Sequence, residues 1–327
     1  MEYILVAGGA GFIGSHLCKA LLDGGQPVLC VDNLITGDPK NIKSLGDRQE
    51  FVFLEHDITG PFAGLSSKLS GYRLSAIFHL ASPASPNKLS RRSYINFPIE
   101  TLLANSAGTY NLLKVADGEK AKFLYASTSE IYGDPLVSPQ PENYFGNVNP
   151  NGLRSVYDEG KRFGEAMTFG FRRKFGVNAR IVRIFNTYGP NMQEDDGRVV
   201  SNFIVQALSG GGITIYGDGS QTRSFCFVSD MIQGLTQAMF HEGTEGEVFN
   251  LGNPDERTVL ELATMIKKMT GSNSQIVHEE LPEGDPARRK PDITKAKRLL
   301  SWEPKVSLEQ GLEKTIEYFK GSMKKLP

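Results

Sequence analysis

The chain has 327 residues, of which 39% are hydrophobic and 22% are charged, and its formal net charge is -1. This composition is typical of an ordinary globular protein that folds as one large α/β domain or as two unequal ones. The balanced charge gives no general argument for nucleic acid or a membrane as partner, so any site for an anionic ligand must be built from locally placed arginines.

The first half alternates short apolar runs with helical patterns, which is typical of βαβ units. The pattern predicts a doubly wound parallel sheet of the Rossmann type. The expected strands are rich in Ile, Val, Leu or Phe and cover residues 3–7, 27–32, 51–55, 76–80, 122–127 and 179–183. Ligands of such folds bind beyond the carboxyl ends of the strands.

From about residue 186 the sequence changes to polar, glycine-rich loops around shorter helices. Amphipathic helices are expected at residues 200–208, 230–240, 259–268 and 308–319. We therefore expect two units: a cofactor-binding domain over residues 1–185 and a smaller α/β substrate lobe formed mainly by residues 186–327. The cleft between them is the expected active site.

Glycines follow the first expected strand with G-x-x-G-x-x-G spacing, at Gly8, Gly11 and Gly14. They permit a tight turn and let backbone amides approach a pyrophosphate, while the N-terminus of the next helix attracts the anion. Asp32 ends the second strand, where a carboxylate can accept hydrogen bonds from an adenosine ribose and would repel a 2′-phosphate. The pattern favours NAD over NADP, although an aspartate in this place can also simply cap a loop.

Topology extends this set to other positions at the ends of the first four strands. The expected cofactor contacts are Gly8, Gly11, Phe12, Ile13, Gly14, Asp32, Asn33, Thr36, Gly37, Asp57, Ile58, Leu80, Ala81 and Ser82, together with Tyr157 and Lys161. The hydrophobic positions among them are equally consistent with ordinary packing.

Tyr157 and Lys161 stand four residues apart in an expected helix, which puts the phenol and the ammonium on one face. The cation can then stabilise a phenolate and make the tyrosine a usable base near neutral pH. An isolated pair of this kind is more often an exposed helix face with a lysine lying past an aromatic ring. Beside a dinucleotide motif, however, the pair indicates proton and hydride chemistry.

Other classes of site find little support in the sequence. Cys18, Cys30 and Cys226 contain no close pair, which is typical of a reducing compartment and predicts neither a disulfide framework nor a zinc site. The five histidines show no ligand spacing, so we expect no metal. No apolar stretch approaches the roughly 20 residues that span a bilayer, and the first residues contain no basic leader. We expect a cytoplasmic protein.

Taken together, these residues resemble the extended short-chain dehydrogenase/reductase superfamily of nucleotide-sugar enzymes and, within it, the UDP-glucuronate decarboxylase (UDP-xylose synthase) family. The resemblance covers nearly the whole chain. The runs that carry it lie at residues 80–86, 126–135, 148–150, 157–162, 183–187, 196–203, 219–225, 250–254 and 289–293.

The resemblance implies a carboxy-lyase with tightly bound, recycled NAD. Tyr157 would be the base that removes the proton of the sugar C4 hydroxyl, Lys161 would lower its pKa, and Thr128 would orient the hydroxyl. Related 4,6-dehydratases carry an aspartate where this chain has Ser129, which argues against dehydration because serine is too weak an acid. Glu130 would orient a water or a proton near C5, unless it is a solvated loop carboxylate.

The resemblance also supplies partners. It implies a UDP-sugar substrate, with contacts expected from Ser129, Asn186, Arg198, Asn202, Tyr216, Arg223 and Arg288. Arginine suits a diphosphate because its fork donates two parallel hydrogen bonds. It further implies a homodimer packed through helices near residues 100–116 and 157–174. The apolar faces of these helices are equally explained by packing against the sheet of their own chain.

Three features depart from the family. The segment 87–97 is longer than the family's loop, Leu103 stands where a lysine near the sugar is expected, and Asn191 replaces an arginine. Arg91 and Arg92 in the altered loop are hypothesised to replace the lost positive charge. Two alternatives stay open: a UDP-uronate 4-epimerase or another C4-oxidising nucleotide-sugar enzyme, and a non-catalytic NAD-binding sensor on the same fold.

Overall fold

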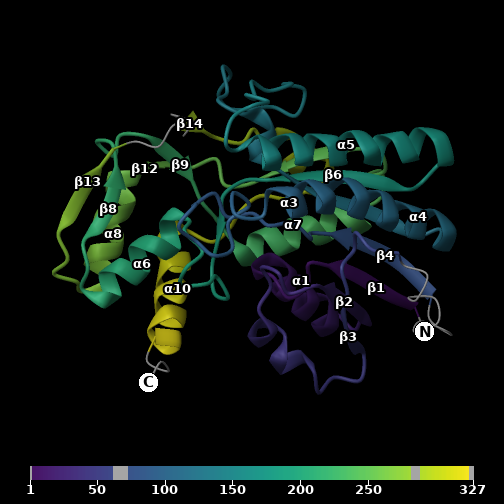
Figure 1. The fold of residues 1–327 in the computed structure, drawn as a ribbon, viewed down its shortest axis with the longest axis horizontal. Coiled ribbons are helices and arrows are strands. Elements are labelled where there is room, and N and C mark those ends of the chain that lie inside the picture. The colour runs from purple at the N-terminus through teal and green to yellow at the C-terminus, as the bar shows by residue number, and fades with distance from the viewer. Residues whose placement is uncertain (1, 62–72, 281–287, 324–327) are drawn as a thin grey trace.

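A seven-stranded, entirely parallel sheet forms the centre of the protein (Figure 1). The computed structural model describes residues 2–61, 73–280 and 288–323. The strand order is β11-β6-β5-β4-β1-β2-β3, which is the order of a doubly wound sheet with crossovers in both directions from β1. The expected Rossmann-type fold is therefore confirmed.

The strands of this sheet are short and mostly apolar, because helices cover both of their faces. They are β1 (Glu2–Ala7), β2 (Val28–Asp32), β3 (Phe51–Glu55), β4 (Arg73–His79), β5 (Lys122–Thr128), β6 (Ala179–Ile184) and β11 (Val248–Leu251). The first six correspond to the expected strands within three residues at each end. The seventh was not predicted from the sequence.

Helices of the sheet-bearing unit lie in two layers. The helices α1 (Phe12–Asp23) and α7 (Val228–Phe240) pack together on one face, and the other face is covered by α3 (Pro98–Leu103), η4 (Ala104–Gly108), α4 (Thr109–Glu119) and α5 (Ser155–Phe175). Figure 1 shows α5 and α7 on opposite sides of β6. A Cβ atom at Gly164 would stand 2.1 Å from the Tyr125 hydroxyl, so glycine lets α5 lie tightly against β5.

The remaining elements form smaller sheets and helices in the second half. The strands are β7 (Thr187–Tyr188), β8 (Ile213–Tyr216), β9 (Thr222–Ser224), β10 (Cys226–Phe227), β12 (Glu256–Thr258), β13 (Ile276–Glu279) and β14 (Arg288–Arg289). The helices are α6 (Val199–Ser209), α8 (Val259–Thr270), α9 (Thr294–Leu300) and α10 (Leu308–Met323). Short helical turns are η1 (Pro39–Asn41), η2 (Lys43–Leu45) and η5 (Ser129–Tyr132). The four helices expected in this half are confirmed.

The expected boundary at residue 185 does not separate the sheet from the rest of the chain. After β7 and α6 the chain returns to the sheet: α7 packs against β5 and β6, and β11 pairs with β6 along residues 248–251. Without β11, the backbone groups on one side of β6 would lack partners. The sheet-bearing unit therefore includes residues 228–251 in addition to the first half.

A buried polar network fixes η5, the turn that follows β5, against the end of the sheet. The guanidinium of Arg183 donates two hydrogen bonds to Glu165, at 2.9 and 2.8 Å, and a third to the Tyr132 hydroxyl at 2.9 Å. The Tyr132 hydroxyl donates in turn to Asn250 of β11 at 2.8 Å. Because each group has a partner, the network holds η5 in one arrangement.

Two kinds of feature are absent from the described residues. No helix there combines the length and the apolar character needed to cross a membrane. The same residues contain no group of three or more His, Cys, Asp or Glu side chains that could hold a metal ion.

Candidate active site

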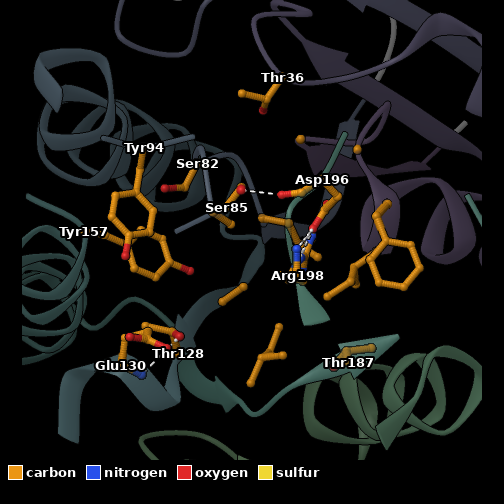
Figure 2. A pocket seen from close by; sticks show the side chains of 18 of the residues that line it. Thr36, Ser82, Ser85, Tyr94, Thr128, Glu130, Tyr157, Thr187, Asp196 and Arg198 are labelled. Atoms are coloured by element: carbon orange, nitrogen blue, oxygen red, sulfur yellow. Dashed lines mark hydrogen bonds and ion pairs between the residues drawn. The ribbon is translucent and has the colours of Figure 1, made fainter. Parts of the chain in front are cut away.

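Two adjoining cavities lie at the carboxyl ends of the central strands. Residues of the glycine turn and of the ends of β2 and β4 line both of them, namely Gly8, Gly11, Thr36, Leu80 and Ser82. We call the cavity that contains Tyr157 the first cavity and the one that contains Asp32 the second cavity. Figure 2 shows the first cavity, with Tyr157 and Thr128 on one side and Arg198 across from them.

The turn between β1 and α1 has no room for side chains. Gly8 has a φ of +82°, and a Cβ atom there would stand 2.7 Å from the amide of Ala81. A Cβ atom at Gly14 would stand 2.1 Å from the carbonyl oxygen of Gly8. Gly11 precedes α1 without a capping side chain, so the first amides of the helix remain available to an anionic ligand at the cavity.

Asp32 ends β2 and lines the second cavity with a residue exposure of 8%. Its carboxylate accepts hydrogen bonds from the amides of Ala10 and Leu34, at 3.0 and 2.8 Å. Burial raises the pKa of Asp32, and these two amides lower it. Two carboxylate oxygens offer about four acceptor positions, so two remain for the hydroxyls of a ribose.

All the expected cofactor positions line one of the two cavities. The first cavity includes Gly8, Gly11, Phe12, Ile13, Gly14, Tyr157 and Lys161, and the second includes Asp32, Asn33, Thr36, Gly37, Asp57, Ile58, Leu80, Ala81 and Ser82. A bound dinucleotide requires a glycine turn before a helix for its pyrophosphate and a carboxylate for its ribose. Both are present here, so the residues fit such a cofactor.

The expected catalytic groups come together in the first cavity. Thr128 ends β5 and lines the cavity together with Tyr157 of α5, and the Thr128 side chain lowers the pKa of the Tyr157 phenol. Lys161, one turn further along α5, donates a hydrogen bond to the Ala126 carbonyl at 2.8 Å, and its Nζ lies 5.8 Å from the centre of the Tyr157 ring. Burial lowers the pKa of Lys161 to about 7.

The protein alone does not make Tyr157 acidic. Burial raises the pKa of its phenol, and the groups that lower it are the Thr128 hydrogen bond and the charge of Arg198. Lys161 lies over the face of the ring and donates its hydrogen bond to the backbone. Helical spacing places two side chains on one face but does not determine where their polar ends point.

Glu130 is held between two arginines. One carboxylate oxygen accepts from Arg154, which precedes α5, and the other accepts from Arg289 of β14. Burial alone would raise the pKa of Glu130, but the charges of Arg154 and Arg289 lower it and keep the group ionised. The alternative of a solvated loop carboxylate is therefore wrong. Ser129, next to it, is buried and lines the first cavity.

Sequence reasoning missed three residues of this wall. Arg154 and Arg289 hold Glu130, and Tyr94 stacks on Tyr157 with the ring centres 4.9 Å apart and the planes 5° apart. Arg154 stands three residues before Tyr157, at the residue that precedes α5, and this spacing was a usable signal. Tyr94 lies in the altered loop, where no pattern pointed to it.

The expected substrate contacts divide into two groups. Ser129, Asn186 and Arg198 line the first cavity, whereas Asn202, Tyr216, Arg223 and Arg288 lie outside both cavities. Arg198 forms a two-point ion pair with Asp196, at 2.5 and 2.7 Å.

The second group lies on α6 and on the small strands of the second half. The Asn202 amide donates to the Gly197 carbonyl at 3.2 Å, and Arg223 donates to the Thr222 carbonyl at 2.9 Å. Tyr216 ends β8 and is partly buried. The side chain of Arg288 is 56% exposed and is paired with Glu256 at 2.7 Å. Its neighbour Arg289 is buried and pairs with Glu130, which lines the first cavity.

The departures from the family pattern fall on different sides of the site. Arg92 lines the first cavity and donates to the carbonyls of Thr36 and Gly37, at 2.9 and 3.2 Å, while Arg91 is exposed and lies outside both cavities. Leu103, the last residue of α3, lines the second cavity together with the expected cofactor positions.

Comparisons with known proteins agree with this geometry. A family model described as GDP-mannose 4,6 dehydratase matches residues 5–315. The chain is 48% identical over 316 residues to UDP-glucuronic acid decarboxylase 1 of Danio rerio, which covers 97% of this chain and 72% of that protein. It is 49% identical over 317 residues to UDP-glucuronic acid decarboxylase 2 of Arabidopsis thaliana, covering 97% of this chain and 68% of that protein.

Solved structures show the same fold. The UDP-glucuronic acid 4-epimerase of Bacillus cereus, in complex with UDP-glucuronic acid and NAD, has a TM-score of 0.86 and 32% identity, covering 98% of this chain and 100% of that chain. The UDP-glucose 4-epimerase of Thermotoga maritima has a TM-score of 0.88 and 33% identity, covering 99% and 100%. The chain therefore belongs to the GDP-mannose 4,6-dehydratase family and, within it, to the UDP-glucuronic acid decarboxylase group of the extended short-chain dehydrogenases/reductases.

Proposed function

We propose that this protein converts UDP-glucuronate to UDP-xylose and carbon dioxide, through a UDP-4-keto-hexuronate intermediate and with NAD regenerated in each cycle. The observation that carries the proposal is the grouping of Thr128, Tyr157 and Lys161 beside an ionised Glu130 in one cavity. The identity of 48–49% to UDP-glucuronic acid decarboxylases over 97% of the chain supports the choice of reaction.

We propose that NAD occupies both cavities, with its adenosine at Asp32 and its pyrophosphate at the glycine turn. When bound, the cofactor supplies an acceptor for the hydride of C4 and returns that hydride at the end of the cycle. The described residues that line the second cavity include no arginine, which supports NAD over a cofactor with a 2′-phosphate.

The first chemical task of the protein is to remove the proton of the C4 hydroxyl. Tyr157 is the proposed base, because its phenol shares the cavity with Thr128 and has the buried Lys161 as a neighbour. Thr128 orients the phenol and the sugar hydroxyl. Lys161 holds the base in place through its bond to the backbone of β5.

The second task is the loss of carbon dioxide. A ketone at C4 lies β to the C6 carboxylate, so the electrons of the breaking C5–C6 bond pass into an enolate and C5 later accepts a proton. Ser129 provides no acid strong enough to expel a hydroxyl, which separates this site from a dehydratase. Glu130 is ionised and cannot itself deliver the proton, so we propose that it orients a water molecule toward C5.

The UDP group is proposed to extend from the first cavity toward the second half of the chain. Asn186 and Arg198 stand at the start of that path. The contacts proposed from sequence further along it are Asn202, Tyr216, Arg223 and Arg288. In this arrangement residues 186–327 supply most of the nucleotide-sugar contacts even though α7 and β11 belong to the sheet.

Product analysis tests the proposal directly. The purified protein is incubated with UDP-glucuronate, and the released gas and the mass of the sugar nucleotide are measured. Carbon dioxide with a UDP-pentose supports decarboxylation. A UDP-uronate of unchanged mass and inverted C4 supports the second candidate, a UDP-uronate 4-epimerase. The TM-score of 0.86 to the Bacillus cereus 4-epimerase is the reason to test for this product. NAD in the protein without any change of UDP-sugars would indicate a sensor.

We also propose a homodimer that packs through α3, α4 and α5. These helices expose large apolar side chains on the molecular surface, at Ile99, Leu102, Tyr110 and Phe163, with exposures of 60%, 37%, 44% and 47%. A second copy is a chemically suitable partner for such a face. Light scattering during gel filtration would measure the mass. The expected cytoplasmic location stays a prediction.

A further inference from the structure

The altered loop places one aromatic side chain firmly in the wall of the first cavity. The Tyr94 amide donates to the Ser85 carbonyl at 3.1 Å, and the Ser93 hydroxyl donates to the same carbonyl at 3.0 Å. The hydroxyl of Ser85 donates to the carbonyl of Asp196 in the second half. Tyr94 is therefore held from both sides of the cleft, and its ring lies face to face with that of Tyr157 (Figure 2).

The hydroxyl of Tyr94 is buried without a hydrogen-bond partner among the described residues. The residue is 1% exposed, yet it lines the first cavity. A phenol whose oxygen has no protein partner costs folding free energy unless another molecule supplies that partner. A polar group in this state beside a base is a candidate contact for the substrate.

The Tyr94 phenol meets charges of both signs. Arg154 acts on it as a cation, and Glu130 and Asp158 act on it as carboxylates. Arg154 and Arg289 pair with Glu130 and offset its negative charge. The phenol itself is neutral and can donate its hydrogen to an anionic oxygen.

We propose that the Tyr94 hydroxyl donates a hydrogen bond to the C6 carboxylate of the uronate and thereby selects uronates over neutral hexoses. This inference rests on the proposed function. Tyr157 acts at the C4 hydroxyl, and the carboxylate hangs from C5, the next carbon of the ring. The Tyr94 ring stacks against that of Tyr157, so its hydroxyl lies beside the proposed base, and the carboxylate on C5 is the substituent that we assign to it.

A neutral donor also suits the chemistry. When the C5–C6 bond breaks, the electron pair moves into the enolate and the carboxylate becomes neutral carbon dioxide. A cation paired tightly with the carboxylate would stabilise the starting state more than the transition state. A phenol orients the group by a hydrogen bond with less of this penalty.

The test compares ligand affinities in a background that cannot turn over. The holoenzyme carrying Tyr157→Phe keeps the stacked ring but lacks the base, and Tyr94→Phe is added to it. Calorimetry with UDP-glucuronate and with UDP-glucose then measures both affinities. We expect Tyr94→Phe to lower the affinity for UDP-glucuronate about tenfold, which is the loss typical of one hydrogen bond to a charged group. The affinity for UDP-glucose should change less than about twofold.

Tyr144→Phe serves as the matched control, because its hydroxyl accepts from the Leu136 amide and the residue lines neither cavity. Equal weakening of both sugars would overturn the proposal, because the contact would then be to a group that both sugars share. Unchanged affinities for both sugars would also overturn the proposal, because the Tyr94 hydroxyl would then donate to an internal water molecule and not to the substrate.

A structural measurement covers the case in which the double variant loses its cofactor. A crystal structure of the Tyr157→Phe holoenzyme with UDP-glucuronate should place a carboxylate oxygen within about 3 Å of the Tyr94 hydroxyl. A carboxylate bound away from the Tyr94 hydroxyl would contradict the proposal. If the wild-type enzyme releases no carbon dioxide, the proposed function fails, but both affinity comparisons still decide the role of Tyr94.

Discussion

Glu130 and Arg289 form a buried ion pair across a separation of 159 residues. Glu130 belongs to the turn after β5, and Arg289 belongs to a two-residue strand of the second half. The pair joins the catalytic wall to the substrate lobe, and the side chain of Arg289 is only 4% exposed.

Replacing Arg289 should therefore destabilise the protein. Arg289→Met leaves Glu130 with Arg154 as its remaining partner, and we expect a loss of about 2–4 kcal/mol in the free energy of unfolding. Arg288→Met is the matched control, because its pair with Glu256 is exposed and solvent weakens it. Urea unfolding of both variants measures the difference. Equal losses in the free energy of unfolding would show that the buried pair contributes no more stability than the exposed one.

The stability contributed by Glu130 should depend on pH in a defined direction. The folded state lowers the pKa of this carboxyl below its ordinary value of 4.5. Its contribution is then fully present above that value and is lost as the pH falls below it. We expect Glu130→Gln to be less stable than the wild type at pH 7, and the gap to narrow in acid. Thermal melts at several pH values test this, and a gap that widens in acid would contradict it.

Gly14 should tolerate no side chain. In Gly14→Ala the new methyl group meets the Gly8 carbonyl at 2.1 Å, so the turn must open and NAD should be lost from the purified protein. Gly170→Ala is the control, because a Cβ atom at that place in α5 meets nothing within 4 Å. It should stabilise the protein by about 0.5–1 kcal/mol. Cofactor content and melting temperature are measured for both.

Loss of the phenol at position 157 should remove turnover without removing the fold. Tyr157→Phe keeps the stack on Tyr94, and we expect the rate of carbon dioxide release to fall by about 10²–10⁴. NAD content should stay at the wild-type level. Full activity in this variant would assign the base to another group.

Arg92 should act on cofactor retention more than Arg91 does. Its two bonds to the carbonyls of Thr36 and Gly37 hold the loop that follows Asp32. We expect Arg92→Ala to release NAD roughly tenfold faster, the equivalent of about 1.4 kcal/mol. Arg91→Ala, on the exposed side of the loop, should leave release unchanged. Dilution into buffer without NAD, followed by assay of residual activity, compares the two rates.

The cofactor half of the site could be predicted from the sequence because its signals are local. A glycine turn and a terminal aspartate lie within a few residues of apolar strands, and a parallel sheet brings strand ends together. The strand β11 escaped prediction because it has only four residues and contains Asn250, whose polar side chain interrupts the apolar run.

The partners of Glu130 could not be predicted in the same way. Arg288 and Arg289 are neighbours in a two-residue strand, where side chains alternate between faces, and nothing local tells which one points inward. Tyr94 lies in a loop that departs from the family pattern. Its stacking on Tyr157 depends on the hydrogen bonds of Ser85 and Ser93, which have no periodic signature.

The late position of β11 has a consequence for biosynthesis. While the ribosome is still making residues before Val248, β6 is the outermost strand of the nascent sheet and its free backbone groups can pair with another chain. Nascent chains that stall in this interval should be prone to aggregation and should depend on chaperones. Once residues 248–251 emerge and pair with β6, the edge passes to β11, a strand of only four residues, and very short edge strands are poor templates for another chain.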